Sequence, residues 1–282
     1  MQARLVRRTV RRLIQMGRCR RLSLHGAPVL FANSFPKSGT HLLTQVLEGF
    51  TRIGPAVVSG LPAVVTYEGD TGRARQLEEI LSDLRRFLPG DVAYGHLHAQ
   101  PEIVSFLCQQ GMAAFFILRD PRDVVVSHVH YITKMAPHHI HHRYYAQELK
   151  TFDERLTASI LGIPSEKIPF PNIRQRFEPY LGWLNQPEVL TLQYEEFILR
   201  QEITLVKVLN HALERGFPLS LEYPMALKAL AESIAPQRSP TFRSGKIGGW
   251  RQAFKEEHIR LFKETTGDLL LQMGYEIDEK WE

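Results

Sequence analysis

The sequence predicts an α/β protein in which a central parallel sheet carries helices on both faces. Short apolar runs that suit buried strands alternate with longer segments of helical periodicity, and they lie at 29–32, 91–96, 113–118 and 189–193. The run AAFFIL at 113–118 is almost continuously apolar, as expected of a central strand in a parallel sheet. Repeats of strand, helix and strand connect parallel neighbours and cover both faces of the sheet.

The helices follow from apolar spacing and from their start and stop signals. Asp120 can cap the helix that begins at Pro121, and Pro89 followed by glycine ends an earlier one. Loops are expected at 54–70, with room for one short strand, and at 235–250. The predicted helices cover 40–50, 71–88, 101–110, 121–135, 151–162, 172–184, 202–214, 224–234 and 255–273.

Positive charge is concentrated at the start of the chain. Residues 1–21 contain eight arginines and no acidic residue, which leaves 27 basic against 30 acidic residues in the remainder. We therefore divide the chain into a basic arm, 1–25, and a single domain, 26–282, and expect no nucleic-acid partner. The two cysteines, Cys19 and Cys108, have neither metal nor redox spacing, which fits a reducing compartment and a cytoplasmic protein.

The arm has the pattern of a basic amphipathic helix. Its apolar residues recur at helical spacing: Val6, Val10, Leu13 and Ile14. Two alternatives stay open: the apolar face packs on the domain with the arginines in solvent, or the arm makes peripheral contact with an anionic membrane. The arm lacks the apolar h-region of a secretory signal, although its composition is also typical of a transit peptide. No apolar run approaches the length of a transmembrane helix.

The sequence PKSGT joins the strand at 29–32 to the next helix. Loop amides and the first N–H groups of a helix point at one spot, where the helix dipole adds positive charge, so this architecture suits an anion. Lys37 adds a full charge, and Ser38 and Thr40 add hydroxyls. The lysine precedes Gly39, whereas a Walker A loop has its lysine after the glycine, so the nucleoside-triphosphate motif is not met. An ordinary turn with a solvated lysine is the alternative.

Other polar residues also follow predicted strands. Arg119, His96 and Tyr194 each come at the end of one, and a glycine-rich segment, FRSGKIGGW, spans 242–250. Arg119 opens the sequence RDPRDVVVS, which ends at Ser127 and places a bidentate donor at a second anion site. Taken alone, that sequence is more typical of a surface ion-pair cluster than of an anion site. Ligands of parallel α/β sheets bind at the carboxyl ends of the strands, where these residues are expected.

In order and spacing, the motifs resemble those of sulfotransferases that use 3′-phosphoadenosine 5′-phosphosulfate (PAPS), over about residues 28–275. PKSGT resembles their 5′-phosphosulfate loop, RDPRDVVVS their 3′-phosphate segment, and FRSGKIGGW their late loop, usually RKGxxGDW. The resemblance implies a P-loop-like three-layer sandwich, as in nucleotide kinases, and sulfonate transfer from PAPS to a hydroxyl or amine with PAP as product. A sulfonate carries less charge than a phosphoryl group, so a lysine and amides can replace magnesium, and we expect no metal.

The resemblance also implies roles for the matched residues. Lys37 stabilises the leaving group, and His96, rather than its neighbour His98, is the general base. Arg119 and Ser127 hold the 3′-phosphate. The full cofactor-binding set adds the rest of the phosphosulfate loop, a tyrosine near the adenine and the late loop: Lys37, Ser38, Gly39, Thr40, His41, Arg119, Ser127, Tyr194, Arg243, Ser244 and Gly245.

The sequence departs from the family pattern at several positions. HL at 41–42 replaces the usual Thr-Trp of the family, in which the tryptophan stacks on adenine. The stacking on adenine is therefore expected to be weaker here or to come from another residue. Ser244 replaces the usual lysine and Gly249 the usual aspartate. KE at 255–256 stands where the dimerisation segment of cytosolic members has Thr-Val, so that dimer is not supported and the oligomeric state is undefined.

Some functional questions stay open at the level of the sequence. The loop at 137–145 holds four histidines, which suit either a metal site or, with better support, the acceptor entrance. The acceptor can be a small molecule, a lipid, a glycan or a peptide. The alternatives to a sulfotransferase are a nucleotide or small-molecule kinase of similar fold and a non-catalytic protein that binds PAP or PAPS.

Overall fold

The computed structural model describes residues 2–19, 24–239 and 245–282, and the chain forms two compact units. The sheet unit comprises Met1–Thr66, Arg75–Leu118 and Trp183–Pro240. The helical unit comprises Tyr67–Ala74, Arg119–Gly182 and Thr241–Glu282.

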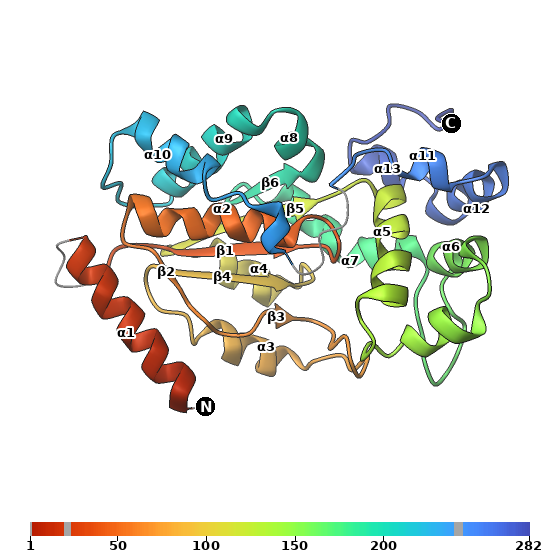
Figure 1. Ribbon diagram of the computed structural model, residues 1–282, viewed down its shortest axis with the longest axis horizontal. Coiled ribbons are helices and arrows are strands. Elements are labelled where there is room, and N and C mark those ends of the chain that lie inside the picture. The colour runs from red at the N-terminus through yellow and green to blue at the C-terminus, as the bar shows by residue number, and fades with distance from the viewer. Residues whose placement is uncertain (1, 20–23, 240–244) are drawn as a thin grey trace. The chain divides into compact units, whose positions relative to one another are not determined.

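The sheet unit is built on one parallel sheet (Figure 1). Its strand order is β2-β4-β1-β5-β6, with β3 paired to β4, and every pairing is parallel. Central β1 and β5 are buried along their whole length because both faces are covered. The strands are β1 Val29–Ser34, β2 Val57–Val58, β3 Val64–Val65, β4 Asp91–His96, β5 Met112–Leu118 and β6 Val189–Gln193.

Helices cover both faces of this sheet. Helix α2, Thr40–Ile53, follows β1 in the chain, leads to β2 on the far side of β4, and packs on β1 and β4. Helix α4, Pro101–Cys108, connects β4 to β5 and packs on β5. The connection from β1 to β2 and the connection from β4 to β5 run in opposite directions along the sheet. Right-handed crossovers therefore place α2 and α4 on opposite faces. The predicted fold class, a parallel α/β sheet with helices on both faces, is confirmed.

The remaining helices complete the two units. The sheet unit also contains α1 Gln2–Arg18, α3 Leu77–Leu84, α8 Tyr194–Leu199, α9 Gln201–Glu214, α10 Tyr223–Ala231 and a 3₁₀ turn at Pro236–Arg238. The helical unit contains α5 Pro121–Lys134, a π-helix Tyr144–Glu148, α6 Phe152–Leu161, α7 Ile173–Leu181, α11 Trp250–Ala253, α12 Glu256–Thr266 and α13 Leu269–Gln272. A further 3₁₀ helix covers Gly182–Asn185. In the described ranges, no helix is long and apolar enough to cross a membrane.

Two predicted helices have other bounds in the structure, and one helix was not predicted. The helix expected at 71–88 begins only at Leu77, because Gly72 adopts a φ of 69° inside a turn that pairs Tyr67 with Ala74. The long helix at 255–273 is interrupted at Gly267, where φ is 53°. Helix α8, directly after β6, was not predicted.

Helix α1 lies on the sheet unit with its polar side inward. Arg8 and Arg12 form ion pairs with the carboxylate of Asp91, the fully buried first residue of β4. Gln15 donates from its side-chain amide to the carbonyls of Thr51 and Gly54, each at 2.8 Å. The apolar residues of the helix are exposed. The alternative in which they pack on the domain is therefore wrong.

The Asp91→Ala variant is expected to lose about 3 kcal/mol of unfolding free energy, because it leaves two largely buried guanidinium groups without their carboxylate. Urea denaturation measures this change. The matched control is Glu264→Ala, whose ion pair with Arg260 is exposed and is worth about 0.5 kcal/mol. Equal losses in both variants would contradict the role of the buried carboxylate.

Candidate active site

The loop between β1 and α2 has the backbone of an anion cradle. Lys37 has a φ of 71°, the one positive φ of a non-glycine residue in the described ranges, and Gly39 has a φ of 99°. Gly39 is the N-cap of α2, and among the described side chains none caps the helix through a hydrogen bond. The first N–H groups of α2 thus lack the intrahelical acceptors that later turns have. These donors and the helix dipole favour an anion at this end.

Side chains around the loop fit a phosphate group. Ser38 Oγ is buried and has no hydrogen-bond partner among the described residues, although buried hydroxyls normally have one. A Cβ on Gly39 would lie 2.6 Å from Cδ2 of Tyr194 and 3.2 Å from Cδ1 of Ile117. The ring of Tyr194 therefore packs directly against the loop, and only glycine fits there. The buried hydroxyl without a partner suits a phosphate of the predicted cofactor.

His96, the last residue of β4, is joined to this loop. Its Nδ1 lies 3.0 Å from the carbonyl oxygen of Ser34, the last residue of β1, and 3.0 Å from Ser34 Oγ. Since a carbonyl accepts but does not donate, Nδ1 carries the hydrogen and Nε2 keeps its lone pair. Ser34 Oγ is also 2.7 Å from Thr40 Oγ1. A chain of hydrogen bonds thus connects the imidazole to the first residue of α2.

Asn33 fixes the segment that follows His96. Its side-chain amide donates to the carbonyl of Leu97 at 3.0 Å, and its Oδ1 accepts from Leu97 N–H at 2.8 Å. Trp183 Nε1 donates to the same carbonyl at 2.8 Å. The backbone N–H of His98 donates to Thr66 Oγ1. The direction in which β4 ends is therefore determined by buried side chains of β1.

The histidines near the loop are neutral at physiological pH. Burial lowers the pKa of His96, the hydrogen bond to Ser34 partly opposes this, and His41 and Lys37 lower it further. Burial, and then the charge of Lys37, lower the pKa of His41. Burial alone lowers the pKa of His98 to about 4. A neutral His96 with a lone pair on Nε2 is able to accept a proton.

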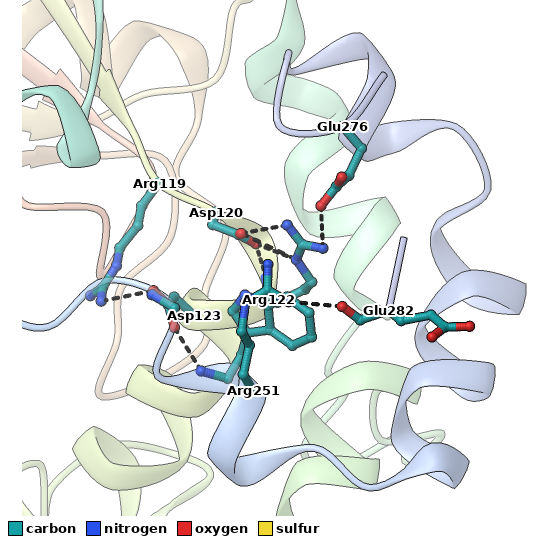
Figure 2. Close-up of polar contacts among 9 residues, drawn as sticks. Arg119, Asp120, Arg122, Asp123, Arg251, Glu276 and Glu282 are labelled. Carbon is teal, nitrogen blue, oxygen red and sulfur yellow. Dashed lines mark hydrogen bonds and ion pairs between the residues drawn. The ribbon is translucent and has the colours of Figure 1, made fainter. Parts of the chain in front are cut away.

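The helical unit contains the residues predicted for the 3′-phosphate. Figure 2 shows Arg119 beside Asp123, whose Oδ2 lies 3.4 Å from Arg119 Nη2. Arg119 Nη2 also donates to the carbonyl of Lys246 at 2.8 Å. Asp123 accepts from the N–H groups of Gly248 at 2.8 Å and of Trp250 at 3.0 Å. This buried carboxylate therefore holds residues 246–250 of the late glycine-rich loop beside Arg119.

The other arginine of RDPRD has a structural role. Arg122 makes a two-point contact with the carboxylate of Asp120 and pairs with Glu276 at 2.6 Å (Figure 2). Its guanidinium carbon lies 4.2 Å from the ring centroid of Trp250 and 4.6 Å from that of Trp281. The first arginine and the second thus have different environments, although the sequence presents them alike.

The structure groups the predicted residues by unit. The sheet unit gathers the phosphosulfate loop, the base candidate and the tyrosine: Lys37, Ser38, Gly39, Thr40, His41, His96 and Tyr194. The helical unit contains Arg119, Ser127 and Gly245. Ser127 lies on α5 one turn beyond Asp123. Arg243 and Ser244 lie outside the described residues.

Three residues that position this machinery were missed in the sequence: Asn33, Ser34 and Asp123. The first two were assigned to a loop, whereas β1 continues through Ser34. Polar residues that end an apolar strand need buried partners, and this is the signal that would have identified them.

Two histidines of the histidine-rich segment contact backbone carbonyl groups. His142 Nδ1 lies 2.6 Å from the carbonyl oxygen of Ile132, and His141 Nε2 lies 3.2 Å from that of Pro169. In the parts of the chain that the structure describes, no group of three or more His, Cys, Asp or Glu residues could hold a metal ion.

The sulfotransferase domain family matches residues 28–274. Among solved structures, retinol dehydratase in complex with androsterone and the inactive cofactor PAP has a TM-score of 0.57 and 16% identity, covering 86% of this chain and 80% of that chain. A mouse sulfotransferase, SULT7A1, complexed with PAP has a TM-score of 0.57 and 19% identity, covering 94% and 90%. Retinol dehydratase with retinol and PAP has a TM-score of 0.57 and 16% identity, covering 86% and 82%. Proteins with curated functions gave no significant match.

The six described strands form one parallel sheet, and the loop after β1 has its lysine before the glycine, unlike a Walker A loop. Because the family match covers most of the chain, the protein belongs to the sulfotransferase domain family. The predicted family, fold and enzyme class are thereby confirmed.

The Ser38→Ala variant is expected to bind PAP about tenfold more weakly, because it removes a hydrogen bond to a charged phosphate. Its unfolding free energy should stay within about 0.5 kcal/mol of wild type, because the hydroxyl has no partner among the described residues. Calorimetric PAP titration and urea denaturation measure the two quantities. The control is Ser233→Ala, which removes a buried hydroxyl that donates to Leu230 and should change stability without changing PAP affinity. Unchanged PAP affinity in Ser38→Ala would refute the assignment.

Proposed function

We propose that the protein transfers the sulfonate group of PAPS to a hydroxyl or amine of an acceptor and releases PAP. The observation that carries the proposal is the hydrogen bond between His96 and Ser34, the last strand residue before the phosphate loop. It leaves Nε2 of a neutral imidazole free to act as a base. Membership of the sulfotransferase domain family supports the reaction class, and PAP in the matched structures supports the donor.

Each residue of the sheet unit has a role in this reaction. His96 Nε2 accepts the acceptor proton as the acceptor oxygen or nitrogen bonds to sulfur and the bond from sulfur to the bridging phosphate oxygen breaks. Lys37 stabilises the charge that develops on that oxygen. Ser38 Oγ and Thr40 Oγ1 donate to the 5′-phosphate, and Ser34 Oγ can orient the latter hydroxyl because the two are hydrogen bonded. Gly39 allows the close approach of Tyr194, which is proposed to lie near the adenine.

The helical unit is proposed to bind the 3′-phosphate. Arg119 donates to a backbone carbonyl, a neutral acceptor that a phosphate can replace with a stronger charge-assisted bond. Ser127 and the late loop, with Arg243, Ser244 and Gly245, are proposed to add donors. The hydrogen bonds of Asp123 to Gly248 and Trp250, and of Arg119 to Lys246, support this because they hold residues 246–250 next to Arg119.

The acceptor is proposed to be a small molecule or a lipid. Androsterone and retinol occur in the matched retinol dehydratase structures, which supports this class over a glycan or a peptide. The segment 137–145 is proposed to line the acceptor entrance. Its histidines and tyrosines suit an apolar molecule with a polar end.

The His96→Ala variant is expected to reduce turnover by about a hundred- to ten-thousandfold with PAPS affinity nearly unchanged, because removal of a general base acts on the chemical step. His98→Ala is the matched control and should cost far less. Radiolabelled sulfate transfer to a series of phenols measures both. The loss in His96→Ala should shrink for more acidic phenols, which need less help in losing their proton.

An inactive His98→Ala with an active His96→Ala would reverse the assignment. Tight PAP binding by the wild type without transfer to any acceptor class would favour the non-catalytic alternative. Turnover of ATP with magnesium would favour the kinase.

The Arg119→Ala variant is expected to weaken PAP binding by about ten- to a hundredfold, the equivalent of a charge-assisted contact of about 1.5–3 kcal/mol. Affinity for adenosine 5′-phosphosulfate, which lacks the 3′-phosphate, should hardly change. Arg119→Lys retains the charge but not the two-point geometry and should fall between wild type and Ala. Titration calorimetry with both ligands measures these differences. Equal losses for the two ligands would place Arg119 elsewhere.

A further inference from the structure

Helix α1 displays an apolar stripe to solvent. The stripe consists of Val6, Val10, Leu13 and Ile14, whose side chains are 62%, 48%, 60% and 57% exposed. Their spacing of four, three and one residues places them on one side of the helix, within about 100° of arc. A surface helix normally turns such a stripe toward the core.

The opposite side of α1 explains this orientation, because it is bound through polar groups. Arg8 and Arg12 pair with Asp91, and they also donate to the carbonyls of Arg86 and Pro89. With Gln15 on the same side, the helix is attached to the sheet unit without its apolar residues. The exposed stripe is therefore a result of specific buried contacts rather than of a loosely attached helix.

Arginines border the stripe along one edge. Arg7, Arg11 and Arg18 are exposed, and α1 contains no acidic residue. Arg11 also donates to the carbonyl of Val58 at 3.3 Å, which holds it beside the stripe. A helix with an apolar face and basic residues next to it has the chemistry of a membrane-surface helix. Anionic headgroups would meet the arginines where the apolar side chains enter the acyl boundary.

We propose that α1 binds an anionic membrane surface, with the apolar stripe inserted and Arg7, Arg11 and Arg18 on the lipid phosphates. A second copy of this chain is the weaker fit. Antiparallel pairing of two stripes about a twofold axis would bring the arginine edges of both copies close together, with no acidic residue on either helix to compensate. A membrane has the complementary charge, and its hydrocarbon accepts the stripe.

Membrane contact through α1 leaves the phosphate loop between β1 and α2 accessible. Asp91, which holds α1, is the first residue of β4, and His96 is the last. A strand of this length separates them by roughly 16 Å, at about 3.3 Å per residue. Membrane binding and transfer to a dissolved acceptor are thus expected to be independent, so the proposal does not rest on the proposed reaction.

Co-sedimentation of the full chain with vesicles tests the proposal. The wild type is expected to bind vesicles of phosphatidylcholine with about 30% phosphatidylglycerol, and to bind pure phosphatidylcholine at least about tenfold more weakly. Leu13→Asp with Ile14→Asp should reduce binding to the anionic vesicles by about tenfold or more, because it places two charges in the stripe. The matched control is Leu199→Asp with Ile203→Asp, an equally exposed pair on α8 and α9, which should bind like the wild type.

A second double variant, Arg7→Gln with Arg18→Gln, tests the arginine edge of α1. Its control is Arg200→Gln with Arg260→Gln, which changes two exposed arginines outside α1. Only the α1 pair should lose anionic-vesicle binding, and the wild type should lose it at high salt. Every variant should retain the far-UV circular dichroism of the wild type. Absence of wild-type binding, or equal loss in the test and control pairs, would overturn the proposal. A dimer that the stripe variant abolishes, without vesicle binding, would assign the surface to a second copy and also overturn it.

Discussion

The pairing of β4 with β1 is the constraint on which the rest of the site depends. It places Asn33 and Ser34, which end β1, beside the residues that end β4. Asn33 then fixes the backbone of Leu97 through two hydrogen bonds, and the carbonyl of Ser34 accepts a hydrogen bond from His96 Nδ1. The same strand continues into the phosphate loop. The base candidate and the anion cradle therefore both start from the end of β1, where buried side chains fix the neighbouring backbone.

Buried carboxylates have a similar organising effect at two other places. Asp123 accepts backbone N–H groups of the late loop and contacts Arg119, so its charge is compensated where an anion is expected to bind. Asp91 pairs with Arg8 and Arg12 and determines which side of α1 meets solvent. In both cases a buried carboxylate fixes a neighbouring segment through hydrogen bonds or ion pairs.

The sequence predicts most of the sheet and the identity of the phosphate loop, because apolar runs and the order PKSGT are local signals. Strand order, the contacts of Asn33 and Ser34, and the difference between Arg119 and Arg122 depend on residues far apart in the chain and could not be predicted. The inward side of α1 was also unpredictable, because periodicity identifies an apolar face but not its partner. Helix breaks at glycines, as at Gly267, depend on a positive φ that sequence alone does not specify.

The hydrogen bond to Ser34 holds His96 in the form with hydrogen on Nδ1 and a basic Nε2. Nitrogen-15 NMR of the histidine rings in the PAP-free protein, assigned with His96→Gln, reports this tautomer. We expect a neutral Nδ1–H tautomer for His96, with a pKa below the usual 6.5 because burial disfavours the imidazolium. A neutral Nε2–H tautomer, or a pKa above 6.5, would contradict it.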